Sequence, residues 1–268
     1  MGKRPWPQEL DRYSSLIGTD VTIVQGPGGN TSFKDGKTLW VKASGTRLKD
    51  AEMTEIFCGI DIQSGELLKR RSGLRPSIER DFHLIIPKPF VIHTHSLTSL
   101  SLAIEGNFGE RSSEYPEIAF IPYARPGKDL CKVIVKDLDF KTHKGAILQN
   151  HGFLTWGDSM VEAYDYLMRF ESKRKDIFRI DEEINSHFTL IDHPKAVTPD
   201  YAVFLSRHTL DEIFSFTDGN LWKKQMFLVI HKAASYIDPK SRITYLTSKE
   251  VRALQSWESE KFRITLNK

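Results

Sequence analysis

The chain has 268 residues, of which 40% are hydrophobic and 27% are charged, and its formal net charge is +3. This composition is typical of a globular protein with a sizeable core, and so balanced a charge argues against a nucleic-acid partner. No run of 18 apolar residues occurs, the N-terminus lacks a signal-peptide core, and the two cysteines form no Cys-x-x-Cys pair, so we expect a cytoplasmic protein without a membrane span.

Apolar periodicity and turn residues predict alternating helices and strands over residues 1–185. Asp158 is the expected N-cap of the long amphipathic helix that ends this region. In chain order we expect a helix near 7–17; strands near 21–24, 31–34 and 38–42; helical or mixed structure at 48–57; a strand near 58–62; a helix near 77–86; a strand at 90–95; a helix near 97–104; a strand near 117–121; a helix near 128–136; strands at 145–149 and 152–155; and a helix over 158–180.

The sequence changes character after this region, because strand patterns become scarce and Pro194 and Pro199 mark a linker. Helices are expected near 200–215, 220–236 and 247–263. Thr247 followed by Glu250 is the capping-box pattern of the last of these helices. We therefore interpret residues 1–185 as an α/β core and residues 186–268 as a helical extension packed on it.

Two histidines stand at the end of a predicted buried strand. The apolar run Pro89–Ile92 leads directly into His93-Thr94-His95. Residues two apart on a strand point to the same face and lie roughly 6–7 Å apart along the chain. Two imidazoles so placed can share one metal ion.

His151 and Glu79 are the further candidates for this site. His151 follows an apolar strand in a polar turn that contains Gly152, a position where α/β folds often place functional groups. Glu79 is expected in the first turn of the helix that Pro76 and Ser77 would begin. A carboxylate near a divalent cation can act as a fourth ligand or as a base.

Two glycine-containing segments have the character of anion-binding loops. Gln25–Ser32 combines three glycines with an amide and two hydroxyls, and Lys42–Thr46 combines a glycine with two hydroxyls and a cation. Glycine lets the backbone approach an anion closely and present its N–H groups. Ser77 at the expected helix N-terminus would add another hydroxyl donor.

Four segments resemble, in their order, the motifs of the class II aldolase/adducin family: Gly28–Ser32, Ala43–Thr46, His93–Ser96 and Gln149–Gly152. The resemblance covers about residues 8–180, and the ordered set is more specific than any single motif. Pro122–Gly127 and Trp257–Phe262 resemble the aldolase portion of rhamnulose-phosphate aldolase/short-chain dehydrogenase fusions, and we expect a free-standing version. The chain is also similar to fuculose-1-phosphate aldolase.

The resemblance implies a three-layer α/β/α sandwich around a mainly antiparallel sheet, with the helical extension beside it, assembled as a homotetramer. It implies a divalent metal on His93, His95 and His151, zinc first, with manganese or iron as alternatives. Glu79 would be the acid/base. The positions that match the substrate-binding or phosphate-binding residues of sugar-phosphate aldolases are Gly29, Asn30, Ser44, Gly45, Thr46 and Ser77.

The chemistry that the resemblance implies is retro-aldol cleavage of a small-molecule sugar phosphate. The metal would chelate the hydroxyl and carbonyl oxygens of a ketose phosphate and stabilise the enediolate that forms as the C3–C4 bond breaks. Glu79 would move the proton that interconverts the enediolate and the ketone. The products would be dihydroxyacetone phosphate, or a similar ketone, and an aldehyde.

Two positions depart from the family pattern or leave it open. Where sugar-phosphate aldolases often have a second serine before the glutamate, this chain has Ile78, and Lys42 or Arg75 could compensate. Some members use a tyrosine of a neighbouring subunit to protonate the leaving group. Tyr123 is our candidate for that role, and Tyr115 is the alternative.

Other functions use the same residues. A 4-epimerase, a dehydratase or a decarboxylase can each use a metal-stabilised enediolate, and the sequence does not separate them from an aldolase. An adducin-like scaffold that has lost its metal is the non-enzymatic alternative. The presence of Glu79 and of all three histidines argues against it.

Overall fold

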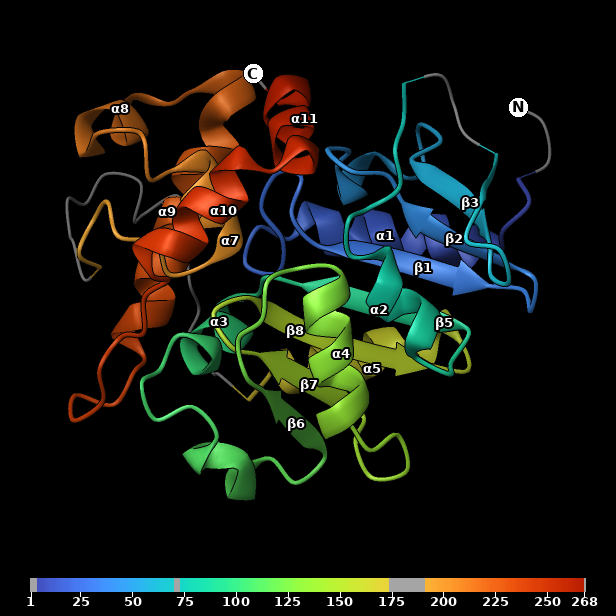
Figure 1. The fold of residues 1–268 in the computed structure, drawn as a ribbon, viewed down its shortest axis with the longest axis horizontal. Coiled ribbons are helices and arrows are strands. Elements are labelled where there is room, and N and C mark those ends of the chain that lie inside the picture. The colour runs from blue at the N-terminus through green and yellow to red at the C-terminus, as the bar shows by residue number, and fades with distance from the viewer. Residues whose placement is uncertain (1–3, 70–72, 174–190, 268) are drawn as a thin grey trace.

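A mixed sheet forms the middle layer of the protein in the computed structural model, which describes residues 4–69, 73–173 and 191–267 (Figure 1). Among these residues the sheet has eight strands in the order β4-β3-β2-β1-β5-β8-β7-β6, and only β6 and β7 are parallel neighbours. The strands are β1 Asn30–Lys34, β2 Thr38–Lys42, β3 Phe57–Asp61, β4 Leu67–Lys69, β5 Phe90–Thr94, β6 Ile118–Ile121, β7 Gly145–Leu148 and β8 Gly152–Gly157.

Helices cover both faces of the sheet, because its central strands alternate side chains between two apolar clusters. Ile92 joins a cluster with α1 (Gln8–Thr19) and α5 (Met160–Glu171). Its neighbour Val91 joins the opposite cluster, with α2 (Arg80–Ile85) and α4 (Lys128–Asp137). The predicted three-layer, mainly antiparallel fold is confirmed.

The C-terminal helices form a group beside one end of the sheet (Figure 1). They share an apolar cluster that includes Phe227, and α3 (Leu97–Ala103) packs against α9 (Leu221–Ser235). Asn150, beside the strand ends, donates from Nδ2 to the carbonyls of Val197 and Thr244 at 2.9 and 2.8 Å. The helices are α7 Pro199–Phe204, α8 Leu210–Ser215, α9 Leu221–Ser235, α10 Ser248–Ser256 and α11 Glu258–Leu266.

The strand predicted at 21–24 is wrong, because Asp20 folds this apolar run into a turn. Its Oδ1 accepts from the backbone and the hydroxyl of Thr22 at 2.9 and 2.6 Å. Its carbonyl accepts from the backbone N–H groups of Ile23 and Val24. An aspartate that binds the backbone two residues ahead competes with a strand. The short strand β4 was not predicted.

Two predicted helix starts are also wrong. The helix expected at 77–86 is the shorter α2, with Glu79 as its N-cap residue, so Ser77 does not stand at a helix N-terminus. The cap of α5 is Ser159, whose side chain accepts from the backbone of Glu162, and not Asp158. Residues 174–180 of the long helix expected over 158–180 lie outside the described residues.

The helix predicted at 247–263 is two helices, separated at Trp257, whose backbone is extended. The indole of Trp257 lies against Gly127 and under the Arg125 guanidinium, 5.3 Å from its ring centroid. The capping box of Thr247 and Glu250 is confirmed. The segment 200–215 is likewise divided into α7 and α8. Within the described ranges, no helix has the length and apolar character to span a membrane.

Candidate metal centre

The structure brings three buried histidines together at one end of the sheet. β5 carries His93 and leads into His95, and the turn between β7 and β8 carries His151. One nitrogen from each ring lies within 4.8 Å of the others. The Nε2 atoms of His93 and His95 are 3.0 Å apart. The predicted convergence of these residues is therefore present.

The three rings differ in what lies at their Nδ1 atoms. His93 donates from Nδ1 to the carbonyl of Phe153 on β8, 2.9 Å away. His95 places Nδ1 3.2 Å from Oδ2 of Asp200 on α7. Within the described part of the chain, Nδ1 of His151 has no hydrogen-bond partner. A proton on Nδ1 leaves Nε2 as a lone-pair donor, so His93 and His95 both direct lone pairs into the shared space.

This donor set fits a divalent cation. Burial lowers the pKa of His93 well below its usual value, so its ring is neutral, as a metal ligand must be. Two uncharged nitrogen lone pairs at 3.0 Å repel each other unless a cation lies between them. Nitrogens that share a tetrahedral zinc, each about 2.0–2.1 Å from it, are separated by roughly 3.3 Å, close to the separation observed.

Glu79 lies beside the three rings. Its Oε1 is 2.8 Å from Nε2 of His151 and 3.7 Å from Nε2 of His93. Burial alone would raise the pKa of this carboxyl, but the neighbouring histidines hold it well below its usual range. Glu79 is therefore an anion positioned to accept or return a proton at the centre.

A hydrogen-bonded chain on β1 fixes the orientation of Glu79. Asn30 donates from Nδ2 to Oε2 of Glu79 at 2.6 Å, and its Oδ1 accepts from Nε2 of His83. Nδ1 of His83 lies 2.7 Å from the hydroxyl of Ser32. Burial lowers the pKa of His83 to about 3, which keeps this ring neutral. Because Oε2 is occupied by Asn30, Oε1 is the oxygen that faces the histidines.

A small pocket opens beside the histidines. Gly29 has a φ of +60°, and a Cβ there would lie 2.8 Å from the carbonyl of His93, so glycine is required. Thr46 does not line the pocket, because its hydroxyl donates to the carbonyl of Ala43 at 2.8 Å. The predicted phosphate-binding residues that line the pocket are Gly29, Asn30, Ser44, Gly45 and Ser77.

Lys42 also lines this pocket, at the end of β2. Its ammonium group donates to the carbonyls of Pro27 and Thr46 at 3.0 and 2.7 Å. Burial and the nearby Arg263 guanidinium lower the pKa of Lys42 to about 7, although Glu79 and Asp200 act in the opposite direction. Arg75 does not line the pocket and instead lies over the ring of Phe262, 4.3 Å away.

Three charged residues of the C-terminal helices belong to this site and were not predicted. Asp200 and Arg263 line the pocket, and Arg263 binds Oδ1 of Asp200 at 2.8 Å and Oε2 of Glu260 at 2.9 Å. Burial alone would raise the pKa of Asp200, but Arg263 and His95 lower it below its usual range. In the sequence, Asp200 after Thr198-Pro199 is an ordinary first-turn acid of a helix, so no local signal marks it.

Neither candidate tyrosine lines the pocket of this subunit. Tyr123 packs against the C-terminal cluster, and its hydroxyl has no hydrogen-bond partner among the described residues. Burial raises the pKa of its phenol above the usual value. The ring of Tyr115 lies beside Phe120 and Phe170, next to α5. The proton-donor role of Tyr123 stays a prediction.

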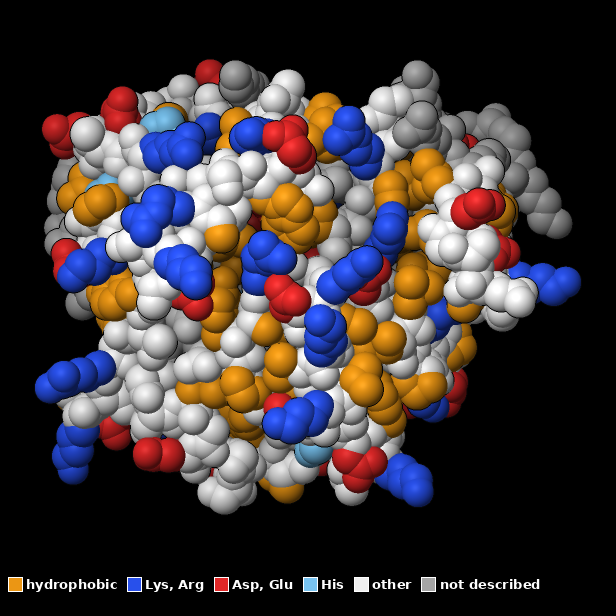
Figure 2. Space-filling view, viewed as in Figure 1, with side chains coloured by type: hydrophobic (Ala, Val, Ile, Leu, Met, Phe, Trp, Pro, Cys, Tyr) orange, Lys and Arg blue, Asp and Glu red, His pale blue; other side chains and the backbone are white. Residues whose placement is uncertain are grey.

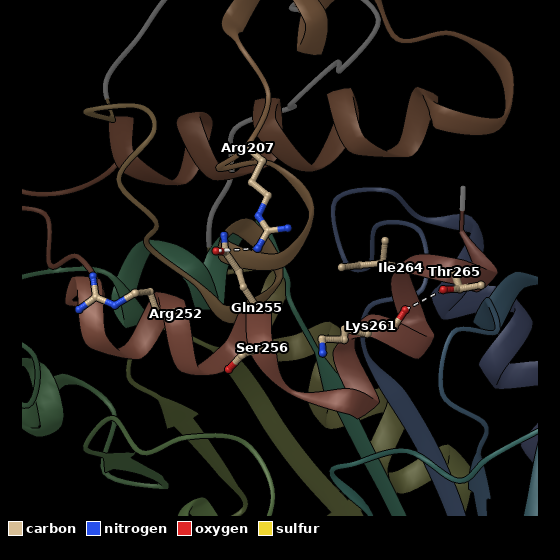
Figure 3. Close-up of a pocket in the computed structure, with 7 residues that line it drawn as sticks. All are labelled: Arg207, Arg252, Gln255, Ser256, Lys261, Ile264 and Thr265. Carbon is tan, nitrogen blue, oxygen red and sulfur yellow. Dashed lines mark hydrogen bonds between the residues drawn. The ribbon is translucent and has the colours of Figure 1, made fainter.

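A more open hollow lies on the outer side of α10 and α11 (Figure 3). Arg207 binds Oε1 of Gln255 at 3.1 Å, while Arg252 and Lys261 point in other directions (Figure 3). Cations of this kind are interspersed with acidic and apolar side chains over the C-terminal helices (Figure 2). Because its cations do not converge, this hollow has no geometry for a specific anion, and the buried pocket remains the candidate site.

Residues 11–174 match the family described as "Class II Aldolase and Adducin N-terminal domain", and the chain belongs to this family. Members of the superfamily are mostly enzymes, chiefly lyases, and the histidine triad is a group that could bind the metal on which class II aldolases depend. Asp200, Glu260 and Arg263 lie outside the matched residues.

Three curated relatives show the range of this family. The chain is 27% identical over 211 residues to the uncharacterized oxidoreductase YuxG of Bacillus subtilis (strain 168), a match that covers 67% of this chain and 30% of that protein. It is 26% identical over 155 residues to an L-fuculose phosphate aldolase of Methanococcus maripaludis, a match that covers 54% of this chain and 81% of that protein. It is 24% identical over 190 residues to a methylthioribulose-1-phosphate dehydratase of Leptospira biflexa, which covers 60% of this chain and 90% of that protein.

A solved structure supports the fold. The N-terminal class II aldolase domain of a conserved protein from Thermoplasma acidophilum superposes with a TM-score of 0.52 at 28% identity. The match covers 65% of this chain and 96% of that one.

Proposed function

We propose that this protein is a metal-dependent lyase that cleaves a sugar phosphate by a retro-aldol reaction, giving dihydroxyacetone phosphate or a similar ketone and an aldehyde. The observation that supports this proposal most directly is the convergence of His93, His95 and His151 beside the buried anion Glu79. The pocket that adjoins them is lined by glycines, serine hydroxyls and Lys42, which suit the anionic end of a phosphorylated substrate.

We propose zinc as the cation that the three histidines hold, with manganese or iron as alternatives. Bound there, it supplies the Lewis acid that stabilises negative charge on the substrate oxygens during bond cleavage. Cleavage also requires a proton to reach the carbon that the aldehyde leaves. The hydroxyl of the carbon that becomes the aldehyde loses a proton in the same reaction. Oε1 of the anionic Glu79 is positioned to accept one proton and return it, because Asn30 holds Oε2 at 2.6 Å.

The pocket residues bind and orient the anionic end of the substrate in this proposal. Gly29 and Gly45 have positive φ angles of 60° and 80°, which let the backbone bend around an anion. Ser44 and Ser77 offer hydroxyl donors, and the Lys42 ammonium group adds a charge where Ile78 provides no hydroxyl. On the family resemblance we further propose a cytoplasmic homotetramer.

The test measures metal and product in the same preparations. We expect inductively coupled plasma mass spectrometry to find about one divalent ion per chain in wild type and almost none in the His93→Ala/His95→Ala variant. Wild type should then release dihydroxyacetone phosphate from a ketose 1-phosphate. No metal in either protein, even after incubation with zinc, manganese or iron, would exclude the lyase and support a scaffold.

A dehydratase is the second candidate, supported by the relative with that name. The products separate the two reactions. Dehydration keeps the carbon skeleton intact and loses water, whereas retro-aldol cleavage divides it, and mass spectrometry of the products distinguishes them.

A further inference from the structure

We propose that Asp200 is a positioning residue of the metal centre, through which the C-terminal helices orient the ligand His95. This inference rests on the proposed metal site and adds to it a residue outside the family match. The feature that supports it is the contact of 3.2 Å between Oδ2 of Asp200 and Nδ1 of His95.

The contact is enclosed by protein. His95 and Asp200 are both buried, with exposed fractions of 8% and 4%. The glycine-rich loop closes over them, because a Cβ added to Gly28 would lie 3.0 Å from Nδ1 of His95 and 3.1 Å from Oδ2 of Asp200. In so dry a place a carboxylate and an imidazole N–H interact far more strongly than they do in water.

Arg263 holds Asp200 in place. Its Nη2 binds Oδ1 of Asp200 at 2.8 Å, and its Nη1 binds Oε2 of Glu260 at 2.9 Å. The two oxygens of Asp200 are thus divided, one toward the arginine of α11 and one toward the histidine. Because a planar guanidinium fixes both of its partners at once, Asp200 has little freedom to turn away from His95.

The consequence for His95 is a fixed tautomer and a fixed ring. A carboxylate at Nδ1 retains the proton there, which leaves Nε2 as the metal-binding lone pair and makes it more basic. The carbonyl of Phe153 acts in the same way on His93. Replacing such a partner behind a metal-binding histidine typically costs about 10–100-fold in metal affinity.

The experiment titrates metal-free full-length protein with Co²⁺, and the absorption of the bound ion gives both the dissociation constant and the ligand field. We expect Asp200→Asn to weaken binding by about 10–100-fold and to change the Co²⁺ spectrum. Asp211→Asn, an exposed aspartate of α8, is the matched control and should behave as wild type. Thermal unfolding of each metal-free protein reports on the fold separately.

Arg263→Lys provides a second test that alters neither the ligand nor Asp200. A lysine cannot bind Asp200 and Glu260 in the same fixed geometry, so we expect a smaller loss of affinity in the same direction. If Asp200→Asn does not fold, the Co²⁺ affinity of Arg263→Lys still tests whether Asp200 orients His95.

Two results would overturn the inference while leaving the proposed function intact. One is wild-type Co²⁺ affinity and spectrum in both variants. The other is a lower unfolding temperature of the metal-free variants with unchanged Co²⁺ binding, which would show a purely structural role. If wild type itself does not bind Co²⁺, Zn²⁺ or Mn²⁺, the proposed metal site fails, and this inference fails with it.

Discussion

Two regions meet at the histidines and hold them by different means. In the α/β core, the backbone positions the histidines. His93 and His95 are two residues apart at the end of β5, and the Phe153 carbonyl of the adjacent strand accepts a hydrogen bond from His93. In the C-terminal helices the contacts come from charged side chains: Oδ2 of Asp200 lies beside His95, and Arg263 of the last helix binds its other oxygen.

This difference distinguishes the backbone interactions that place the histidines from the side-chain interactions that adjust their orientation. Strand register is set by a ladder of backbone hydrogen bonds that one substitution rarely breaks. A buried ion pair between helices depends on single side chains and is strongly weakened when one partner is lost. We therefore expect changes in the core to abolish activity and changes in the helices to modulate it.

The largest effect is expected from loss of a ligand in the core. His151→Ala removes one of three nitrogens, so metal affinity should fall by more than the roughly 100-fold limit expected for a residue behind a ligand. Isothermal titration of the metal-free protein with Zn²⁺ measures this. His143→Ala, in a turn remote from the centre, is the control, and equal affinities in the two variants would remove His151 from the site.

Glu79→Gln should separate binding from chemistry. The amide keeps the size of the side chain but no longer accepts a proton, so turnover should fall by about 10²–10⁴-fold while the metal content stays near that of wild type. Steady-state kinetics on a ketose 1-phosphate that wild type cleaves, with metal analysis of the same sample, test this prediction. Full activity of the variant would show that another group is the acid/base.

Asn150 tests how firmly the two regions are joined. Asn150→Ala leaves the carbonyls of Val197 and Thr244 without their donor, and the free energy of unfolding should fall by about 2–3 kcal/mol. Urea denaturation measures the loss. Asn150→Gly is the matched variant, because it also removes the amide but suits the φ of 54°, so it should be the more stable of the two.

The most gradual effect is a pH dependence of the stability that arises from Lys42. The unfolded chain keeps the proton up to a pKa of 10.5, whereas the folded protein releases it near 7. Between these values the unfolded state binds more protons, so the free energy of unfolding of wild type should rise with pH relative to Lys42→Met, by at most about 1.4 kcal/mol per pH unit. A constant difference between the two proteins across this range would contradict the lowered pKa.

Local sequence patterns predicted the structure correctly where it depends on interactions between residues close together in the chain. The strand period of two predicted that His93 and His95 share a face, and the capping box predicted the start of α10. The same reasoning failed at 21–24, where the side chain of Asp20 competes with the strand. It also failed at Trp257, whose extended backbone divides the predicted helix and whose indole lies against the distant Gly127.

The sequence by itself therefore determined the layers of the fold, the histidine triad with its glutamate, and several of the residues that line the adjoining pocket. Those features depend on side-chain periodicity, turn residues and ordered motifs, all of which are local. Only the tertiary structure decided that Asp200 and Arg263 belong to the site. Their contacts exist because α11 turns at Trp257 and lies over the pocket, and no local pattern specifies the packing of distant side chains.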